Sequence, residues 1–361
     1  MSSKGPSGAV RFFLLVPGVG VVLFLIASYF LALLLGPALF FSTSEGVEFS
    51  GRLLIALRLQ LFGVLDLYVP VQPTLGSLFL FLWIVFVICF VVSWRWRESF
   101  HHVVGRAFSR SAGSLFDNWL FTMAVVASAL FAAFVLITAF QDVVGVETGV
   151  PSLPENRFET YLTLSYATLI EEISFRISPI GLFLVAYLFL AKGNTVATMS
   201  LWQRVRLFFA AFLYPEEAKR MVGLKTVAAN GFRRGLSLGE WVMVLVTAMV
   251  FGLMHFVAGV GWGSGKITTA FMNGFVFGLV YLAYGFQAPI LLHWFLNYYF
   301  YTYSLAAEFY PSVFSVLDLL DWVNLFLGLF VLLAFAILAL RRLTRSVPET
   351  KPLEFGLLSG T

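Results

Sequence analysis

Two carboxylates and a guanidinium lie close together in an apolar stretch of the chain, TLIEEISFRIS, at positions 168–178. In a helix, side chains four residues apart share a face, so Glu172 and Arg176 can form an ion pair. Glu171 points about 100° away from Glu172 and has no cation at helical spacing. A charge inside a bilayer is costly and usually has a partner or a function. The stretch therefore predicts either a structural ion pair or part of a functional site.

The placement of the histidines favours the functional alternative. The chain has four histidines. His101 and His102 lie in a basic loop, where we expect a solvated surface. His255 and His293 lie in apolar segments, and Asn297 follows His293 by one helical turn on the same face. Two intramembrane histidines and an asparagine, with an unpaired carboxylate elsewhere in the chain, predict one shared site.

Such a site could do several kinds of chemistry. Glutamate and histidine together can activate a water molecule, and a second histidine with an asparagine can donate hydrogen bonds to a developing oxyanion. The same side chains could bind a metal such as zinc, or they could relay protons or bind an ion, as acids in transporters do. The common HExxH zinc signature does not occur in the sequence. The glycine-rich stretch GVGWGSGK, at positions 259–266, links two apolar segments and is expected to be a loop rather than a nucleotide site.

The composition predicts that membrane helices position these residues. Hydrophobic residues make up 60% of the 361 positions and charged residues 12%, whereas soluble domains are roughly half apolar and about a quarter charged. The expected fold is an all-α polytopic membrane protein. We attribute the net charge of +4 to loops on the cytoplasmic side and expect no nucleic-acid partner. A single cysteine, Cys89, excludes an internal disulfide framework.

Eight segments are long and apolar enough to span a bilayer as helices. They are 13–36, 75–93, 118–140, 158–191, 241–257, 266–285, 288–305 and 322–340. The fourth is overlong and contains Pro179, which predicts a kink or a second short helix after the span. The stretch 53–68 contains charged and polar residues and is expected to be interfacial or re-entrant rather than a span.

Basic residues gather on alternate loops, which predicts the orientation. The loops 94–117 and 192–240 and the C-terminal tail are rich in Lys and Arg. Such loops stay in the cytoplasm, so both termini are predicted to be cytoplasmic. In the 192–240 insertion, aromatic residues alternate with arginines, which indicates an amphipathic helix at the bilayer surface. Pro215, followed by two glutamates, predicts the first turn of another helix.

Three short motifs occur in order along the chain, each in an apolar segment: Glu171-Glu172-x-x-x-Arg176, Phe251-x-x-x-His255 and His293-x-x-x-Asn297. Together they resemble the motifs of the CPBP intramembrane proteases, a family also called Abi, which contains the type II CAAX prenyl endopeptidases. The resemblance covers roughly residues 158–305. It predicts three parts: N-terminal helices and loops at 1–157, a catalytic core at 158–305 and a last membrane helix with a basic tail at 306–361.

The resemblance implies an endopeptidase that cleaves a membrane-anchored protein or peptide, nominally a prenylated CAAX segment, within the lipid bilayer. It implies that Glu171 is the general base, that His255 helps to hold the attacking water and that Arg176 holds Glu172. By the same resemblance, His293 and Asn297 would stabilise the oxyanion.

The cofactor and the function class stay open at this point. The family is described both as metal-dependent, for example with zinc, and as using a metal-free glutamate mechanism; the missing HExxH favours the metal-free reading. Two other functions remain alternatives: a non-catalytic membrane scaffold or bacteriocin-immunity factor, and an ion-coupled transporter.

Overall fold

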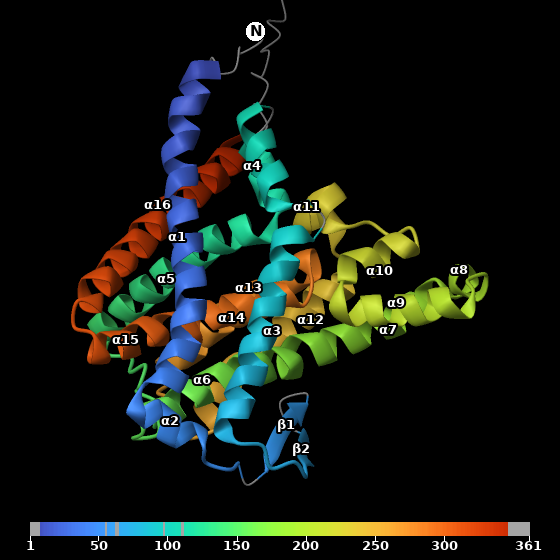
Figure 1. The fold of residues 1–361 in the computed structure, drawn as a ribbon. Helices are drawn as coiled ribbons and strands as arrows, with labels where there is room; N and C mark the ends of the chain where they lie inside the picture. The colour runs from blue at the N-terminus through green and yellow to red at the C-terminus, as the bar shows by residue number, and fades with distance from the viewer. Residues whose placement is uncertain (1–7, 55, 62–64, 97, 110–111, 346–361) are drawn as a thin grey trace, which may run out of the picture.

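The protein is an all-α polytopic membrane protein, seen here in a computed structural model that describes residues 8–54, 56–61, 65–96, 98–109 and 112–345 (Figure 1). The long helices are α1 (Gly8–Ser42), α3 (Leu75–Arg95), α5 (Trp119–Val144), α6 (Arg157–Glu172), α7 (Ser178–Ala191), α12 (Leu238–Val257), α13 (Gly265–Tyr284) and α16 (Val313–Arg345). The shorter helices are α2 (Ser44–Ser50), α4 (Phe100–Ser109), α8 (Gly193–Ala197), α9 (Leu201–Leu213), α10 (Pro215–Met221), α11 (Val227–Gly235), α14 (Gln287–Trp294) and α15 (Phe300–Phe309). A 3-10 turn, η1 (Ala112–Asp117), and two π-helical turns, η2 (Ile173–Ile177) and η3 (Phe295–Tyr299), complete the helical elements.

Within the described residues, seven helical segments are long and apolar enough to cross a membrane. They correspond to seven of the eight predicted spans. The remaining predicted span, 288–305, is also helical, because α14, η3 and α15 follow one another without a break. This segment is not among the seven that have the length and composition of a span. The predicted helices are therefore present, and seven of them have the length and composition of a span.

The overlong fourth segment differs from its prediction. Residues 157–191 form one helical run of 35 residues, about 52 Å at 1.5 Å per residue, which exceeds a hydrocarbon core of about 30 Å. Its irregularity is the π-helical turn η2, and Pro179 lies just after it, in the first turn of α7. Proline is tolerated there because the first helical turn needs no amide hydrogen from it. No separate short helix follows Pro179 within this run.

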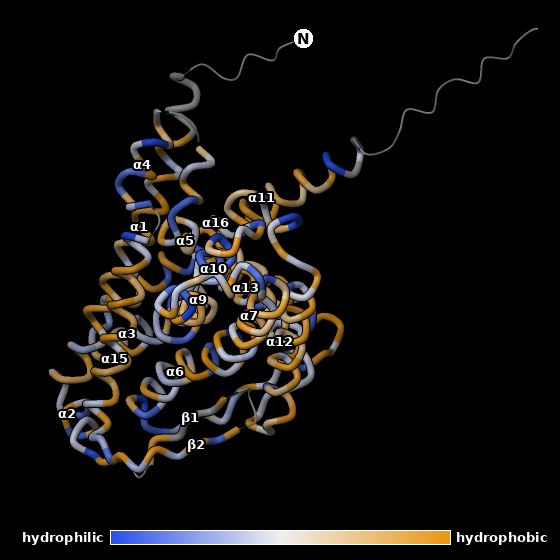
Figure 2. Tube along the Cα trace, turned by 90° about the vertical axis from the view of Figure 1, so that its right-hand side faces the viewer, coloured by the Kyte–Doolittle hydropathy of each residue, from blue (hydrophilic) through white to orange (hydrophobic). Residues whose placement is uncertain are grey.

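The stretch 53–68 forms a β-hairpin, which agrees with the prediction that it is not a membrane-spanning helix. Strands β1 (Leu57–Leu61) and β2 (Leu65–Val69) pair antiparallel, with Leu57 opposite Val69 and Leu61 opposite Leu65. Residues 55 and 62–64 lie outside the described part of the chain. Strand β1 packs against η2 and α6. The hairpin lies at one end of the helix bundle in both views (Figures 1 and 2).

Hydrophilic residues occur at both ends of the bundle. They lie on α4, near α11 and at the end of α16 at the top of Figure 2, and on α2 and the hairpin at the bottom. His101 and His102, on α4, are exposed, as the sequence predicts. The predicted basic residues Arg97, Arg110 and Lys351 lie outside the described residues. Helix α1 begins, and α16 ends, at the same end of the bundle as α4 (Figure 1).

The 192–240 insertion folds into four helices, α8 to α11. Pro215 begins α10, which confirms the prediction for that residue. Helix α9 is amphipathic: Leu207 is buried, whereas Trp202 is 82% exposed and Phe209 is 57% exposed. The insertion packs against α7 and α13 through a second, smaller hydrophobic core. These two helices contact elements that carry the sequence motifs, because α7 follows η2 and α13 packs against α12.

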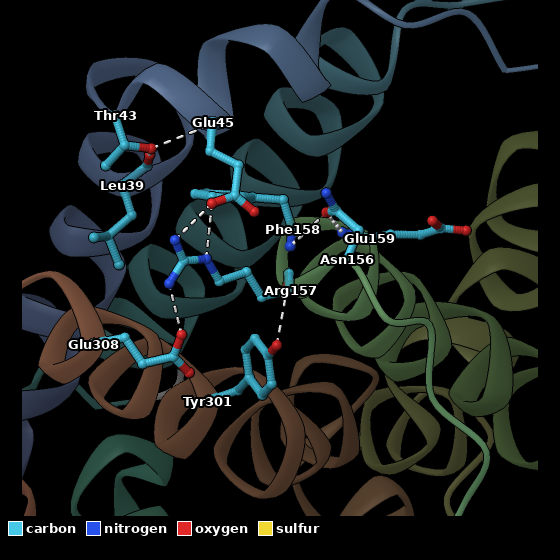
Figure 3. A network of polar contacts seen from close by, with 10 residues as sticks. Leu39, Thr43, Glu45, Asn156, Arg157, Phe158, Glu159, Tyr301 and Glu308 are labelled. Carbon is cyan, nitrogen blue, oxygen red and sulfur yellow. Dashed lines mark hydrogen bonds and ion pairs between the residues drawn. The ribbon is translucent and has the colours of Figure 1, made fainter.

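A polar cluster ties α6 to the N-terminal helices and to α15 (Figure 3). Arg157, the first residue of α6, donates hydrogen bonds to Glu45 of α2 at 2.9 and 2.6 Å and to Glu308 of α15 at 2.7 Å. The Tyr301 hydroxyl donates to the Arg157 carbonyl at 3.0 Å, and the ring of Phe309 lies 4.2 Å from the guanidinium. This cluster fixes the start of α6, the helix on which Glu171 and Glu172 lie.

Candidate active site

The ion pair predicted from sequence spacing is present at the junction of α6 and η2. Arg176 Nη1 donates to Glu172 Oε1 at 3.1 Å, and both side chains are fully buried. The guanidinium also lies 4.0 Å from the centre of the Phe251 ring on α12. A buried arginine keeps its proton, so both the carboxylate and the aromatic face stabilise its charge.

Glu172 also contacts His293, on the distant helix α14. The distance from His293 Nδ1 to Glu172 Oε1 is 2.8 Å. A carboxylate oxygen paired with a guanidinium accepts hydrogen bonds, so Nδ1 is the donor in this contact. Glu172 therefore orients the imidazole and directs its Nε2 atom to the opposite side.

Glu171 lies on that opposite side. Its Oε2 atom is 3.8 Å from His293 Nε2, and its side chain is 27% exposed, in contrast to the fully buried Glu172. Among the described residues, no hydrogen bond reaches Glu171 Oε2, although this atom is itself buried. Glu171 also interacts electrostatically with His255 and with Lys266, at the start of α13. The Glu171 carboxylate thus lies beside the His293 imidazole and interacts with His255 and Lys266.

His255 is oriented by its own helix. Its Nδ1 atom lies 2.8 Å from the Phe251 carbonyl oxygen, which can only accept, so Nδ1 donates and Nε2 is left for other partners. The Phe251 ring contacts the rings of His255 and His293, with centroid distances of 4.5 and 6.3 Å. Phe251 is therefore the shared neighbour of Arg176 and both histidines, a role that the sequence motif did not reveal.

Asn297 lies in the turn that follows His293 along the chain. It is part of η3 and lines a cavity of about 410 Å³ together with Leu164, Ser304 and Asp321. Within the described residues, no hydrogen bond joins Asn297 to the other predicted site residues. The structure thus gathers Glu171, Glu172, Arg176 and His293 closely, with His255 beside them.

The lack of a side chain at Gly274 leaves room for the Arg176 guanidinium where α12 packs against α13. A Cβ atom at Gly274 would lie 2.9 Å from Arg176 Nη2 and 3.1 Å from the Cα atom of Ala248. Gly274 and Gly278 have the G-x-x-x-G spacing that is typical of close helix packing, and Gly278 faces the side chain of Val244 in the same interface. The contact with Arg176 is an additional role for Gly274.

Lys266 is a further residue that sequence reasoning missed. Its Nζ atom lies 3.9 Å from the centre of the Trp262 ring, within the glycine-rich loop between α12 and α13. Backbone hydrogen bonds tie this loop to residues 147–152: Gly263 N donates to Thr148 O and Ser152 N donates to Val260 O. The stretch is thus a loop, as expected. No local pattern links Lys266 to Glu171, because the two residues come close only in the folded chain.

Carboxylates and imidazoles are also the side chains that bind metal ions such as zinc. Among the described residues, no group of three or more His, Cys, Asp or Glu side chains is arranged to hold a metal ion. Glu172 Oε1, the best-placed carboxylate oxygen, already accepts hydrogen bonds from Arg176 and His293. Of the two adjacent glutamates, Glu172 is therefore engaged by protein partners.

Comparison with known protein families agrees with this site. Residues 158–299 match the family described as type II CAAX prenyl endopeptidase Rce1-like. The matched segment contains η2, η3 and the side chains described above, so this part of the chain is similar to a family of CAAX-type intramembrane proteases. The resemblance noted from the three motifs is thereby confirmed at the family level. No curated protein and no solved structure matches the chain.

Proposed function

We propose that the protein is an endopeptidase that hydrolyses a peptide bond of a membrane-anchored protein or peptide, such as a prenylated CAAX segment, within the bilayer. The observation that carries the proposal is the position of His293 between the two glutamates, 2.8 Å from Glu172 and 3.8 Å from Glu171. One carboxylate is committed to orienting the imidazole, and the other is free to react. General base catalysis requires a group that is free to accept a proton, and Glu171 meets this requirement.

In the proposed mechanism, Glu171 accepts a proton from a water molecule while the oxygen of that water attacks the scissile carbonyl carbon. The Nε2 atom of His255 accepts a hydrogen bond from the other O–H of the water, which keeps the water molecule near Glu171. The tetrahedral intermediate then breaks its C–N bond. The proton taken up by Glu171 goes to the leaving amine, and the carboxylate is regenerated.

The negative charge on the carbonyl oxygen needs stabilisation during this step. We propose that His293, protonated at both nitrogens, donates from Nε2 to this oxygen, while Glu172 and Arg176 hold the ring in place. The Asn297 amide, one turn further along, is proposed to donate to the substrate from the wall of its cavity. This cavity lies between α5, α6, α15 and α16 and offers an approach from the side of the bundle.

The test is cleavage of membrane-anchored and prenylated peptides by the purified protein in lipid nanodiscs. Glu171→Gln keeps the shape of the side chain but cannot take up the proton of the water, so turnover should fall by about 10²–10⁴-fold. The matched control is Glu159→Gln, an exposed glutamate on the same helix. Cleavage by Glu171→Gln at the wild-type rate would show that Glu171 is not the base.

A panel of peptides with and without the prenyl group addresses the substrate. If no peptide is cleaved by wild-type protein under any lipid condition, a non-catalytic role would be favoured over hydrolysis. If both kinds are cleaved equally, the prenyl group does not determine the specificity.

A further inference from the structure

A second cavity, separate from the candidate active site, lies in the 192–240 insertion. It has a volume of about 320 Å³ and lies between the end of α10, the turn before α11 and the first turn of α12. Its wall includes Lys219, Lys225, Arg234 and Glu240, together with Tyr187 of α7. Three of these side chains are cationic at neutral pH and one is anionic.

A buried ion pair holds one wall of the cavity in place. Lys219 Nζ donates to both oxygens of Glu240, at 2.8 and 3.0 Å, and also to the carbonyl of Gly235. The Ser237 amide donates to Glu240 Oε2 at 2.7 Å. These contacts neutralise Lys219 and Glu240 and fix the turn between α11 and α12.

The other carboxylates of the insertion are also engaged. Glu217 pairs with Arg206 and Arg220, at 3.4 and 3.3 Å. Glu216 accepts a hydrogen bond from the Val227 amide. No carboxylate therefore remains in the insertion for Lys225 and Arg234, and neither forms an ion pair with any other described residue.

Two unpaired cations on one cavity wall favour an anion. Arginine and lysine are the side chains that bind phosphate, arginine through two parallel hydrogen bonds and lysine as a point charge. The cavity is large enough to hold a phosphate group with its substituents. Charge complementarity thus points to a phosphorylated ligand.

The apolar surroundings indicate where this phosphate comes from. The cavity lies at the start of α12, and α7 and α12 both belong to candidate membrane spans. Leu238 and Leu190, near these helix ends, are 81% and 84% exposed, which is costly in water and favourable in lipid. Cations at the end of a span lie at the depth of the lipid headgroups. We infer that this cavity binds the headgroup phosphate of an anionic phospholipid, and this inference is independent of the proposed protease activity.

The experiment uses the full-length protein in nanodiscs that contain phosphatidylcholine with a minor fraction of fluorescent phosphatidylglycerol. Energy transfer from an introduced label near α11 reports enrichment of the anionic lipid. Wild-type protein should enrich it, and Lys225→Gln/Arg234→Gln should lower the apparent affinity by about tenfold or more. Arg341→Gln/Arg342→Gln removes the same charge from the end of α16 and should retain the enrichment.

Several results would overturn the inference. Equal loss of enrichment in the α16 control would mean that only general surface charge attracts the lipid. Displacement of the lipid by millimolar inorganic phosphate or glycerol phosphate would indicate a site for a soluble anion instead. Thermal unfolding in pure phosphatidylcholine checks that the variants fold, and Lys225→Arg/Arg234→Lys, which keeps both charges, should restore enrichment; failure to do so in a folded variant would also count against the site.

Discussion

Glu171 and Glu172 are neighbours in sequence, but their surroundings assign them different tasks. Glu172 is fully buried and accepts hydrogen bonds from Arg176 and His293, whereas Glu171 is partly exposed and Oε2 accepts none from the described residues. A substitution at either position removes one negative charge. The consequences should nevertheless be different.

We predict that Glu172→Gln lowers the stability of the fold by about 3–5 kcal/mol, because Arg176 keeps its charge and loses its buried counter-ion. Activity should fall as well, since His293 loses the carboxylate that orients it. Denaturant unfolding of the purified variant measures the first effect, and peptide cleavage measures the second. Glu171→Gln serves as the matched control and should unfold like the wild type. Equal stability of all three proteins would contradict the prediction.

The local ion pair was predictable from sequence, and the rest of its environment was not. Spacing of four residues in a helix is sufficient to bring Glu172 and Arg176 together. His293 is 121 positions away from Glu172, and periodicity gives no information about that distance. The contact of Phe251 with Arg176 likewise depends on how α12 packs on α6 and η2. The three-motif resemblance identified the participants, but only the fold shows which glutamate is committed to His293.

Among the helices, the interface between α12 and α13 is the one that the site depends on most directly. Gly274 lies where a methyl group would meet Arg176 and the backbone of α12 at about 3 Å. Either the guanidinium or the whole of α13 must move to accept a side chain there.

We predict that Gly274→Ala destabilises the protein by about 1–3 kcal/mol, as other overpacked interiors do, and reduces cleavage at the same time. The reason is that the displaced guanidinium can no longer hold Glu172 in place. Gly20→Ala, in α1, is the control, because a Cβ atom there meets nothing within 4 Å. Thermal unfolding and cleavage rates should separate the two variants; a Gly274→Ala protein that melts and cleaves like the wild type would rule out a tight contact.

The helices were predictable from apolar length, but the irregular elements were not. The strands LRLQL and LDLYV do alternate between apolar and polar residues with the period of a β-strand. The sequence analysis did not predict these strands, because the alternation lies in an apolar stretch that also fits a segment at the membrane surface. The π-helical turns η2 and η3 have no sequence signature, although both contain a motif residue, Arg176 or Asn297. Such turns often occur at functional sites.

At the scale of the whole molecule, the Arg157 cluster joins three parts of the chain that are far apart in sequence. Glu45 belongs to the N-terminal helices, Arg157 begins the helix that carries Glu171 and Glu172, and Glu308 lies at the end of α15. These contacts thus join all three parts of the predicted division at residues 157 and 305.

We predict that Arg157→Ala reduces the stability of the whole protein by about 1 kcal/mol, because its ion pairs are partly exposed and water screens them. Added salt should lower the stability of the wild type toward that of the variant, since the Debye length shrinks. Glu159→Ala, two residues further along the helix and exposed, should behave like the wild type. Unfolding of the three proteins at low and high NaCl concentration checks this. A salt response that survives in Arg157→Ala would show that the cluster is not its source.

During synthesis, the helix that carries Glu172 and Arg176 enters the bilayer well before α14 has been made. Each unpaired charge at the centre of an inserting helix costs about 2.5–3.5 kcal/mol, and these two charges arrive together with their partner already one turn away. The segment can therefore insert into the membrane with these two opposite charges already paired. His255 follows with α12 and Lys266 with α13, and His293 comes last. A partly made chain has no complete set of proposed catalytic groups, so the proposed protease cannot act on membrane proteins while it is still attached to the ribosome and lacks α14.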